Sequence, residues 1–168
     1  MATRANQSTT ADASRAVRLI SFKVADELFV IDIMALRQII PYQRTTPVPK
    51  APEFIEGIIV LRNEVIPVID LRERLFPESP RGVETSLVLV TRTSEGVIGM
   101  RIDQVHRILN VNLDAILPSP EIIRGLAGEL FVGVIRMEDE VYLVLDIEAI
   151  LSTEEKISLR NADLTPEE

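Results

Sequence analysis

Two aspartates occupy matching places in the sequence, and a pair of carboxylates could carry out hydrolysis. Asp70 and Asp146 each end a run of β-branched residues and precede a short stretch of helical character. Held on facing elements, they could serve as general acid and general base. The junction of a strand and a helix is also the preferred place for an N-cap aspartate, whose carboxylate accepts hydrogen bonds from backbone N–H groups. We favour the capping role over a carboxylate-dependent hydrolase.

The single histidine, His106, lies three residues after Asp103. A metal site or a general acid-base pair would need further ligands or a nucleophile, and the sequence contains no second His and no Cys. The glycine-rich phosphate loops, the nucleophile elbow and the zinc-protease motif are also missing. We therefore predict no catalytic residue, no metal and no cofactor, and the chain is not expected to be an enzyme.

Composition narrows the classes of partner. The net charge is −8 and no Lys/Arg cluster alternates with aromatic residues, so nucleic acid is not an expected partner. No apolar run approaches the roughly 20 residues that span a bilayer, and the N-terminus lacks the apolar segment of a signal peptide. We expect a cytoplasmic protein without direct membrane insertion. With 46% hydrophobic but only 4% aromatic residues, the core must consist of Ile, Val and Leu, which favours β-sheet.

The first half of the sequence predicts two hairpins separated by a proline-rich loop. Residues 17–33 form two apolar runs joined at Ala25-Asp26-Glu27. Residues 34–40 fit either a strand or a helical turn, and the prolines of residues 41–52 predict an ordered crossing loop. The second hairpin spans residues 58–69. Residues 1–16 are expected to be a disordered tail.

The turn and the end of the second hairpin have specific chemistry. Asn63 stands where the turn needs a residue that tolerates positive φ. Asp70 is placed to cap a short helix, and Glu73 is placed to return a hydrogen bond as the second half of a capping box. This helix must end before Pro77.

The second half repeats the pattern of the first. A strand, a turn at residues 94–96 and a second strand are expected within residues 86–109, and residues 102–109 align on residues 33–40 with four shared apolar positions. Residues 133–151 align on residues 57–75 without a gap, and seven of these nineteen positions are identical. Asp139 falls on Asn63, which predicts the same turn conformation twice. Two similar, mainly antiparallel β units result, and barrel closure would remove their exposed edges.

One side chain in the repeat stands out. Arg62 lies at the tip of an apolar hairpin, where its counterpart in the second half is Glu138. A charge at a tip is commonly no more than a solvated residue. A guanidinium on a rigid turn is also well placed to bind a carboxylate or a carbonyl oxygen of a partner.

Four segments, in this order and spacing, resemble the CheW-like coupling proteins of bacterial chemotaxis. They read FKVADELFVIDI, TPVPKAPEFIEGIIVLRNEVIPVIDLRERL, GVIGMRIDQVHRIL and GVIRMEDEVYLVLDIEAIL. The resemblance covers residues 17–151 and implies two intertwined, SH3-like, five-stranded β-barrel subdomains with short helices, followed by a C-terminal helical extension over residues 152–168. It also implies a non-enzymatic scaffold in signal transduction.

The resemblance further implies the partners. Such adaptors couple the cytoplasmic tips of chemoreceptors (methyl-accepting chemotaxis proteins) to the regulatory domain of the histidine kinase CheA within membrane-associated receptor arrays. The kinase is bound through contacts between barrels, and the receptor's helical hairpin lies against an apolar groove. An adaptor of a pilus or gliding motility pathway, or an unrelated peptide-binding β-barrel module, is the alternative.

By position, the resemblance assigns receptor binding to Leu36, Gln38 and Leu87, and assembly with kinase and receptor to Arg62. Three glycines match family glycines that we interpret as backbone requirements: Gly57, Gly99 and Gly133. Two positions depart from the family, which usually has Glu in place of Gln38 and Gly in place of Asn63. Gln38 loses a charge-assisted contact but keeps a hydrogen-bond acceptor, and Asn63 should cost little at positive φ.

Overall fold

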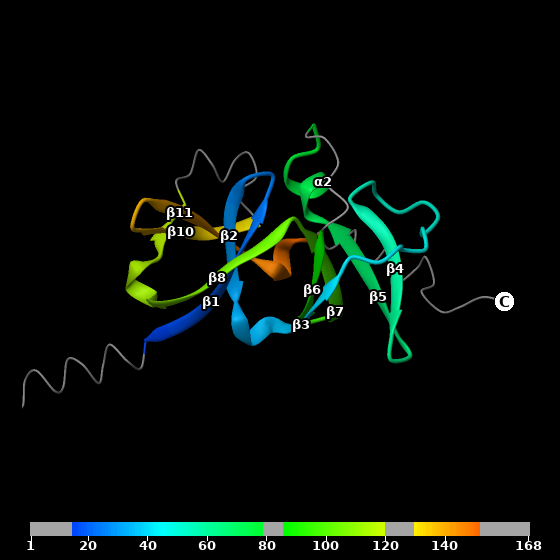
Figure 1. Ribbon diagram of the computed structural model, residues 1–168, viewed down its shortest axis with the longest axis horizontal. Coiled ribbons are helices and arrows are strands. Elements are labelled where there is room, and N and C mark those ends of the chain that lie inside the picture. Colours follow the sequence, from blue (N-terminus) through cyan, green and yellow to red (C-terminus); the bar gives the residue numbers. More distant parts are fainter. Residues whose placement is uncertain (1–14, 79–85, 120–129, 152–168) are drawn as a thin grey trace, which may run out of the picture.

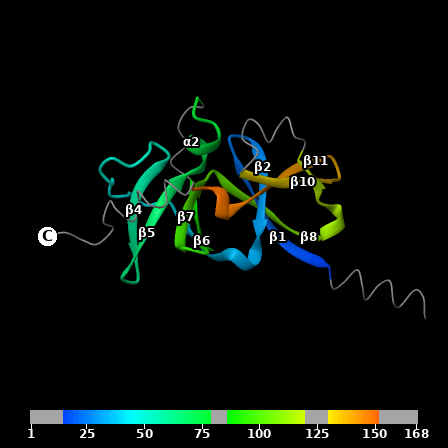
Figure 2. The same cartoon turned by 180° about the vertical axis from the view of Figure 1, so that it is seen from behind.

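Two curled β-sheets pack side by side in the computed structural model, which describes residues 15–78, 86–119 and 130–151 (Figures 1 and 2). The six-stranded sheet contains, in spatial order, β8 (Gln104–Asn112), β1 (Ala16–Val24), β2 (Glu27–Asp32), β11 (Glu140–Leu145), β10 (Phe131–Met137) and β9 (Leu117–Pro118). The five-stranded sheet contains β3 (Leu36–Pro41), β6 (Leu87–Thr93), β7 (Gly96–Ile102), β5 (Glu64–Asp70) and β4 (Ile55–Leu61). The predicted all-β class with two similar units is confirmed.

Short helical segments connect the strands. They are η1 (Ile33–Ala35), α2 (Leu71–Leu75), η2 (Leu113–Ala115) and η4 (Ile147–Ala149). The segment of residues 34–40 therefore contains both of the conformations left open by its sequence, a 3₁₀ turn followed by strand β3. In Figure 1, η4 lies between the two sheets.

The two halves of the chain exchange strands. Strands β1 and β2 pair with β8 and β11 of the second half, while β6 and β7 pair with β3 and β5 of the first. The two parallel pairs have the same register. Val68 of β5 lies opposite Gly99 of β7, and its repeat equivalent, Val144 of β11, lies opposite Val30 of β2. Each sheet therefore contains two strands of one half and at least three of the other, so neither half can form its sheet alone.

Closure of the sheets differs from the expected five-stranded barrels. Among the described residues, neither sheet closes by a continuous strand ladder, and ladder order leaves both open. Instead, the chain segment that follows one edge strand, β3 or β8, pairs with a strand at the opposite side of the same sheet, β4 or β10. Thr46 pairs with Ile58 beside β4, and Leu117 of the additional strand β9 pairs with Val134 of β10. These bridges cover part of the exposed edge of each sheet.

Three apolar clusters fill the molecule. Two lie within the curled sheets, one around Val30, Ile135 and Tyr142 and the other around Ile66 and Val90. The third and largest joins the two sheets and contains Phe29, whose ring lies about 6 Å from the rings of Phe22, Phe76 and Phe131. Strand β1 is buried on both faces because it contributes to two clusters.

Both aspartates cap helical segments. The Asp70 carboxylate accepts hydrogen bonds from the N–H groups of Arg72 and Glu73 at the start of α2, and the Asp146 carboxylate accepts one from Glu148 at the start of η4. The capping box is not completed as expected. The N–H of Asp70 donates instead to the carbonyl oxygen of Phe54, 2.8 Å away, and is therefore not available to the side chain of Glu73.

The two hairpin tips differ in backbone conformation. Arg62 and Asn63 have φ values of 48° and 66°, so both central residues of the first turn are left-handed, as in a type I′ turn. In the second turn Glu138 has a φ of 57°, but Asp139 does not have positive φ. The prediction that Asp139 repeats the conformation of Asn63 is wrong, because identical turn length does not force identical turn type.

Three glycines fill positions where a side chain would collide. A Cβ atom on Gly57 would lie 2.4 Å from the carbonyl oxygen of Thr46, and one on Gly133 would lie 2.4 Å from that of Leu117. A Cβ atom on Gly99 would lie 2.9 Å from Cγ1 of Val88. Only Gly57 of these three also has positive φ, 153°. Close approach of neighbouring strands, more than φ, is what these positions require.

Two predictions fall mainly outside the described residues. They are the disordered tail of residues 1–16, of which only Arg15 and Ala16 are described, and the helical extension of residues 152–168. In the parts of the chain that the structure describes, no helix has the length and apolar character to cross a membrane.

Candidate functional site: the hairpin-tip pocket

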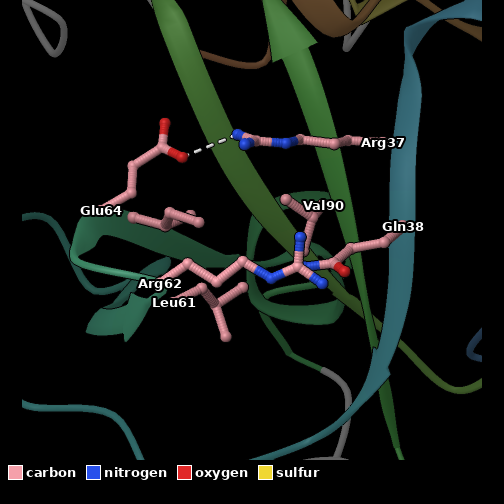
Figure 3. A pocket seen from close by; sticks show the side chains of 7 residues that line it. Arg37, Gln38, Leu61, Arg62, Glu64 and Val90 are labelled. Carbon is pink, nitrogen blue, oxygen red and sulfur yellow. Dashed lines mark hydrogen bonds and ion pairs between the residues drawn. The ribbon is translucent and has the colours of Figure 1, made fainter.

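A small pocket lies where the tip of the β4–β5 hairpin approaches strand β3 (Figure 3). We call it the hairpin-tip pocket, and its lining residues are Arg37, Gln38, Leu61, Arg62, Glu64, Ile66 and Val90. Ile66 and Val90 are almost completely buried and give it an apolar floor. Three charged groups and one amide surround that floor, so the pocket combines an apolar base with a polar rim.

An ion pair joins the two sides of the pocket. Arg37 on β3 and Glu64 on β5 approach to 2.7 Å, with side chains 38% and 42% exposed. At that exposure the pair contributes little to stability. It does fix the charge balance of the rim, because the only carboxylate lining the pocket already has a cationic partner.

Arg62 extends across the pocket toward Gln38 in Figure 3. Its backbone is held at positive φ by the tight turn, which limits where the side chain can point. Within the described residues, neither Arg62 nor Gln38 has a side-chain hydrogen bond or ion pair. The guanidinium is therefore available to a group from outside the chain.

The predicted binding residues fall into two places. Gln38 and Arg62, far apart in the sequence, line the same pocket. Leu36 and Leu87 do not line it; they are half-buried at opposite ends of the β3–β6 ladder and pack against the central cluster. Three of the four residues belong to the paired strands β3 and β6, and Arg62 lies at the tip between β4 and β5, which come last in the same sheet.

Sequence reasoning missed Arg37 and Glu64. The available signal was their alignment with His106 and Glu140 in the second half, two pairs of residues that could each form an ion pair across a sheet. In the structure His106 Nε2 lies 3.0 Å from Glu140 Oε2. His106 thus forms a structural contact. Asp103 has different partners: it accepts a hydrogen bond of 2.8 Å from the N–H of Ala25 and forms an ion pair with Arg72.

The side chains around Glu140 lower the pKa of its carboxyl group. The hydrogen bond from His106 is the main cause that lowers the pKa of Glu140, and Tyr142 and Arg107 act in the same direction. Burial raises the pKa of Tyr142. No group of three or more His, Asp or Glu side chains in the described ranges could hold a metal ion.

A second polar cluster lies under the crossing loop. Arg101 pairs with Glu56 and lies 3.8 Å over the ring of Tyr42, and its Nε donates to the hydroxyl of Ser86 at 2.8 Å. Burial, followed by the hydrogen bond with Glu56, raises the pKa of Tyr42. These contacts tie the loop to the sheet and pair the Arg101 guanidinium within the chain, so Arg101 positions the loop rather than binding a partner.

The lowered pKa of Glu140 predicts a pH dependence of stability. A carboxyl whose pKa is lower in the folded than in the unfolded state stabilises the fold at pH above its unfolded pKa, and this stabilisation is lost as the pH falls through the folded pKa. Glu140→Gln should therefore remove part of the stability at neutral pH and flatten its decline below about pH 5. Urea denaturation from pH 7 to pH 3 would measure this.

The matched control for this prediction is Glu53→Gln, which changes an exposed glutamate on the crossing loop. Its stability curve should run parallel to that of the unchanged protein. A Glu140→Gln variant whose curve also runs parallel would contradict the proposed contribution of the His106 contact.

Comparison with known proteins identifies relatives over most of the chain. The family model described as CheW-like domain matches residues 18–155. The chain is 31% identical over 148 residues to the chemotaxis protein CheW of Treponema pallidum, covering 86% of this chain and 87% of that protein. It is 31% identical to the CheW protein of Klebsiella aerogenes, covering 83% and 84%.

A solved structure also matches. The crystal structure of the scaffolding protein TtCheW from Thermoanaerobacter tengcongensis superimposes with a TM-score of 0.75 at 25% sequence identity, covering 83% of this chain and 90% of that one. Both sheets of the present structure are therefore those of a known fold.

Proposed function

The chain belongs to the CheW-like family, and from this premise we propose that it is a non-enzymatic scaffold that couples chemoreceptors to a CheA-type histidine kinase. The observation that supports this most is the hairpin-tip pocket. It brings together Gln38 and Arg62, the two residues to which family resemblance gives receptor binding and assembly. A rigid turn with an available guanidinium is suited to recognition and carries no nucleophile or general base for catalysis.

The same proposal covers location and partners. The protein works in the cytoplasm, bound to receptor arrays at the membrane through the cytoplasmic tips of receptors, and its CheW-like domain spans residues 17–151. The regulatory domain of the kinase binds one of the two curled sheets of this chain through a barrel of its own. Leu36 and Leu87 take part in receptor binding by supporting strand β3 from the central cluster.

A three-component pull-down tests the coupling role. The protein would be combined with the kinase regulatory domain and a receptor-tip fragment from the same genome. Retention of both partners is the expected result. Retention of the kinase domain alone would assign the receptor role to another protein, and retention of neither would overturn the proposed function.

Arg62→Asp should weaken partner binding without weakening the fold. Arg62 is exposed, has no ion pair in the described part of the chain, and occupies a left-handed position that Asp tolerates. We expect loss of binding of about tenfold or more, because charge-assisted hydrogen bonds contribute about 1.5–3 kcal/mol. Calorimetric titration with the partners and thermal unfolding would measure the two effects separately.

Arg136→Asp is the control, since Arg136 is an exposed arginine on β10 of the other sheet. It changes the net charge equally and should bind nearly as the unchanged protein does. A large fall in the melting temperature of Arg62→Asp would show that Arg62 is an internal structural tie and would contradict the assignment.

A further inference from the structure

The internal repeat supplies a second hairpin tip, at residues 138–139, for comparison with the hairpin-tip pocket. The alignments of residues 33–40 with 102–109 and of residues 57–75 with 133–151 relate four positions at this place. The equivalent pairs are Arg37 and His106, Gln38 and Arg107, Arg62 and Glu138, and Glu64 and Glu140. The strand registers agree with these alignments, because β3 carries a bulge between Leu36 and Gln38 and β8 carries one in the overlapping equivalent stretch, between Val105 and Ile108.

The outer ion pair is present in both halves. Arg37 lies 2.7 Å from Glu64, and His106 lies 3.0 Å from Glu140. In each case a basic group on the first strand meets a carboxylate just after the hairpin tip. The two hairpin tips therefore share this ion pair. They differ at the other two equivalent pairs of positions, Gln38 and Arg107, and Arg62 and Glu138.

The inner pair differs between the halves. In the second half a cation on the strand, Arg107, faces an anion at the tip, with 3.8 Å between Arg107 and Glu138 and 3.4 Å between Arg107 and Glu140. Arg107 Nε also donates to the hydroxyl of Tyr142 at 3.0 Å. At the second hairpin tip the chain therefore supplies both the cation, Arg107, and the anions that pair with it, Glu138 and Glu140.

In the first half the cation stands at the tip and the anion is missing. Arg62 replaces the tip carboxylate, but the strand position opposite carries neutral Gln38. The carboxylate nearby, Glu64, is taken by Arg37. Relative to the other half, the hairpin-tip pocket lacks one negative charge opposite Arg62.

We propose that this negative charge comes from the partner, as the carboxylate of an acidic side chain on the receptor tip that enters the hairpin-tip pocket and binds Arg62. The assignment rests on the proposed coupling function. A planar carboxylate can accept two parallel hydrogen bonds from one guanidinium. The amide of Gln38 donates to the same carboxylate, and the methylene stem of the acidic residue packs on the apolar floor of Ile66 and Val90.

Supplying the carboxylate within the chain tests this assignment directly. Gln38→Glu restores the residue that the family usually has at this position and so gives the chain its own anion opposite Arg62. A receptor tip that supplies a carboxylate to fit the neutral Gln38 should then bind this variant about tenfold or more weakly. Arg62→Gln should weaken it to a similar degree and should also reduce the dependence of affinity on salt. Calorimetric titration at two salt concentrations, with the kinase regulatory domain present, would measure both.

Arg136→Gln is the matched control and should leave binding and its salt dependence unchanged. Unaltered binding by Arg62→Gln, or tighter binding by Gln38→Glu, would overturn the inference while leaving the coupling function in place. An unchanged protein that binds neither partner would instead overturn the coupling function itself. Thermal unfolding of each variant identifies any loss of binding that comes from loss of the fold.

Discussion

Replacing Gly57 by alanine should destabilise the fold by about 3 kcal/mol or more, because two costs combine at this position. The new Cβ atom would lie 2.4 Å from the carbonyl oxygen of Thr46, and the φ of 153° is unfavourable for any residue with a side chain. The oxygen cannot move freely, since it accepts a hydrogen bond of 2.8 Å from the N–H of Ile58. Relief of the collision would break the bridge that covers β4.

Two further glycines separate these costs. Gly133→Ala meets the same collision, 2.4 Å from the carbonyl oxygen of Leu117, without positive φ. Gly96→Ala meets open space but has a φ of 134°. Urea denaturation should rank the losses of free energy of unfolding in the order Gly57, Gly133, Gly96. A Gly57→Ala variant that loses no more than Gly96→Ala would show that the strand contact is not needed.

Phe29→Ala should cost about 3–5 kcal/mol, the range found for removing a large aromatic side chain from a core. Phe29 is fully buried in the cluster that joins the two sheets, and its ring contacts those of Phe22, Phe76 and Phe131. With 4% aromatic residues in the chain, this group of rings has few substitutes. Chemical denaturation should show a single transition at a lower midpoint, because the damaged core is common to both sheets.

Val141→Ala is the control for the loss of Phe29. Val141 lies on β11 with 52% exposure, so its truncation should change stability by no more than about 0.5 kcal/mol. A cost below about 1 kcal/mol for Phe29→Ala would mean that the two sheets are stabilised independently of each other.

The candidate site could be predicted only in part. Arg62 was identifiable because a charge at the tip of an apolar hairpin stands out in the sequence, and Gln38 because it departs from a family pattern. Their meeting in one pocket depends on the curl of the five-stranded sheet, which brings β3 against the tip of the β4–β5 hairpin. Arg37 and Glu64 were missed because an ion pair across that gap has no local signal.

The sequence by itself determined the features that arise within a few residues of one another. The hairpin turns, the left-handed Asn63, the capping by Asp70 and Asp146, and the repeat of residues 57–75 are of this kind. Their cause is local: backbone sterics, the hydrogen bonds of a short polar side chain, and the alternation of apolar residues along a strand. Even here Asp139 adopted another conformation than its counterpart.

Tertiary structure decided which strands pair and therefore which charges meet. The repeat indicated two β units, but pairing within each half would have been equally compatible with its apolar pattern. The exchange that sets β3 beside β6 and β8 beside β1 follows from packing, because it buries Phe29 and its neighbours in one core shared by the sheets. That exchange also places Gln38 near Arg62 in an open pocket, whereas Arg107 lies near Glu138 and is paired with carboxylates of the chain itself.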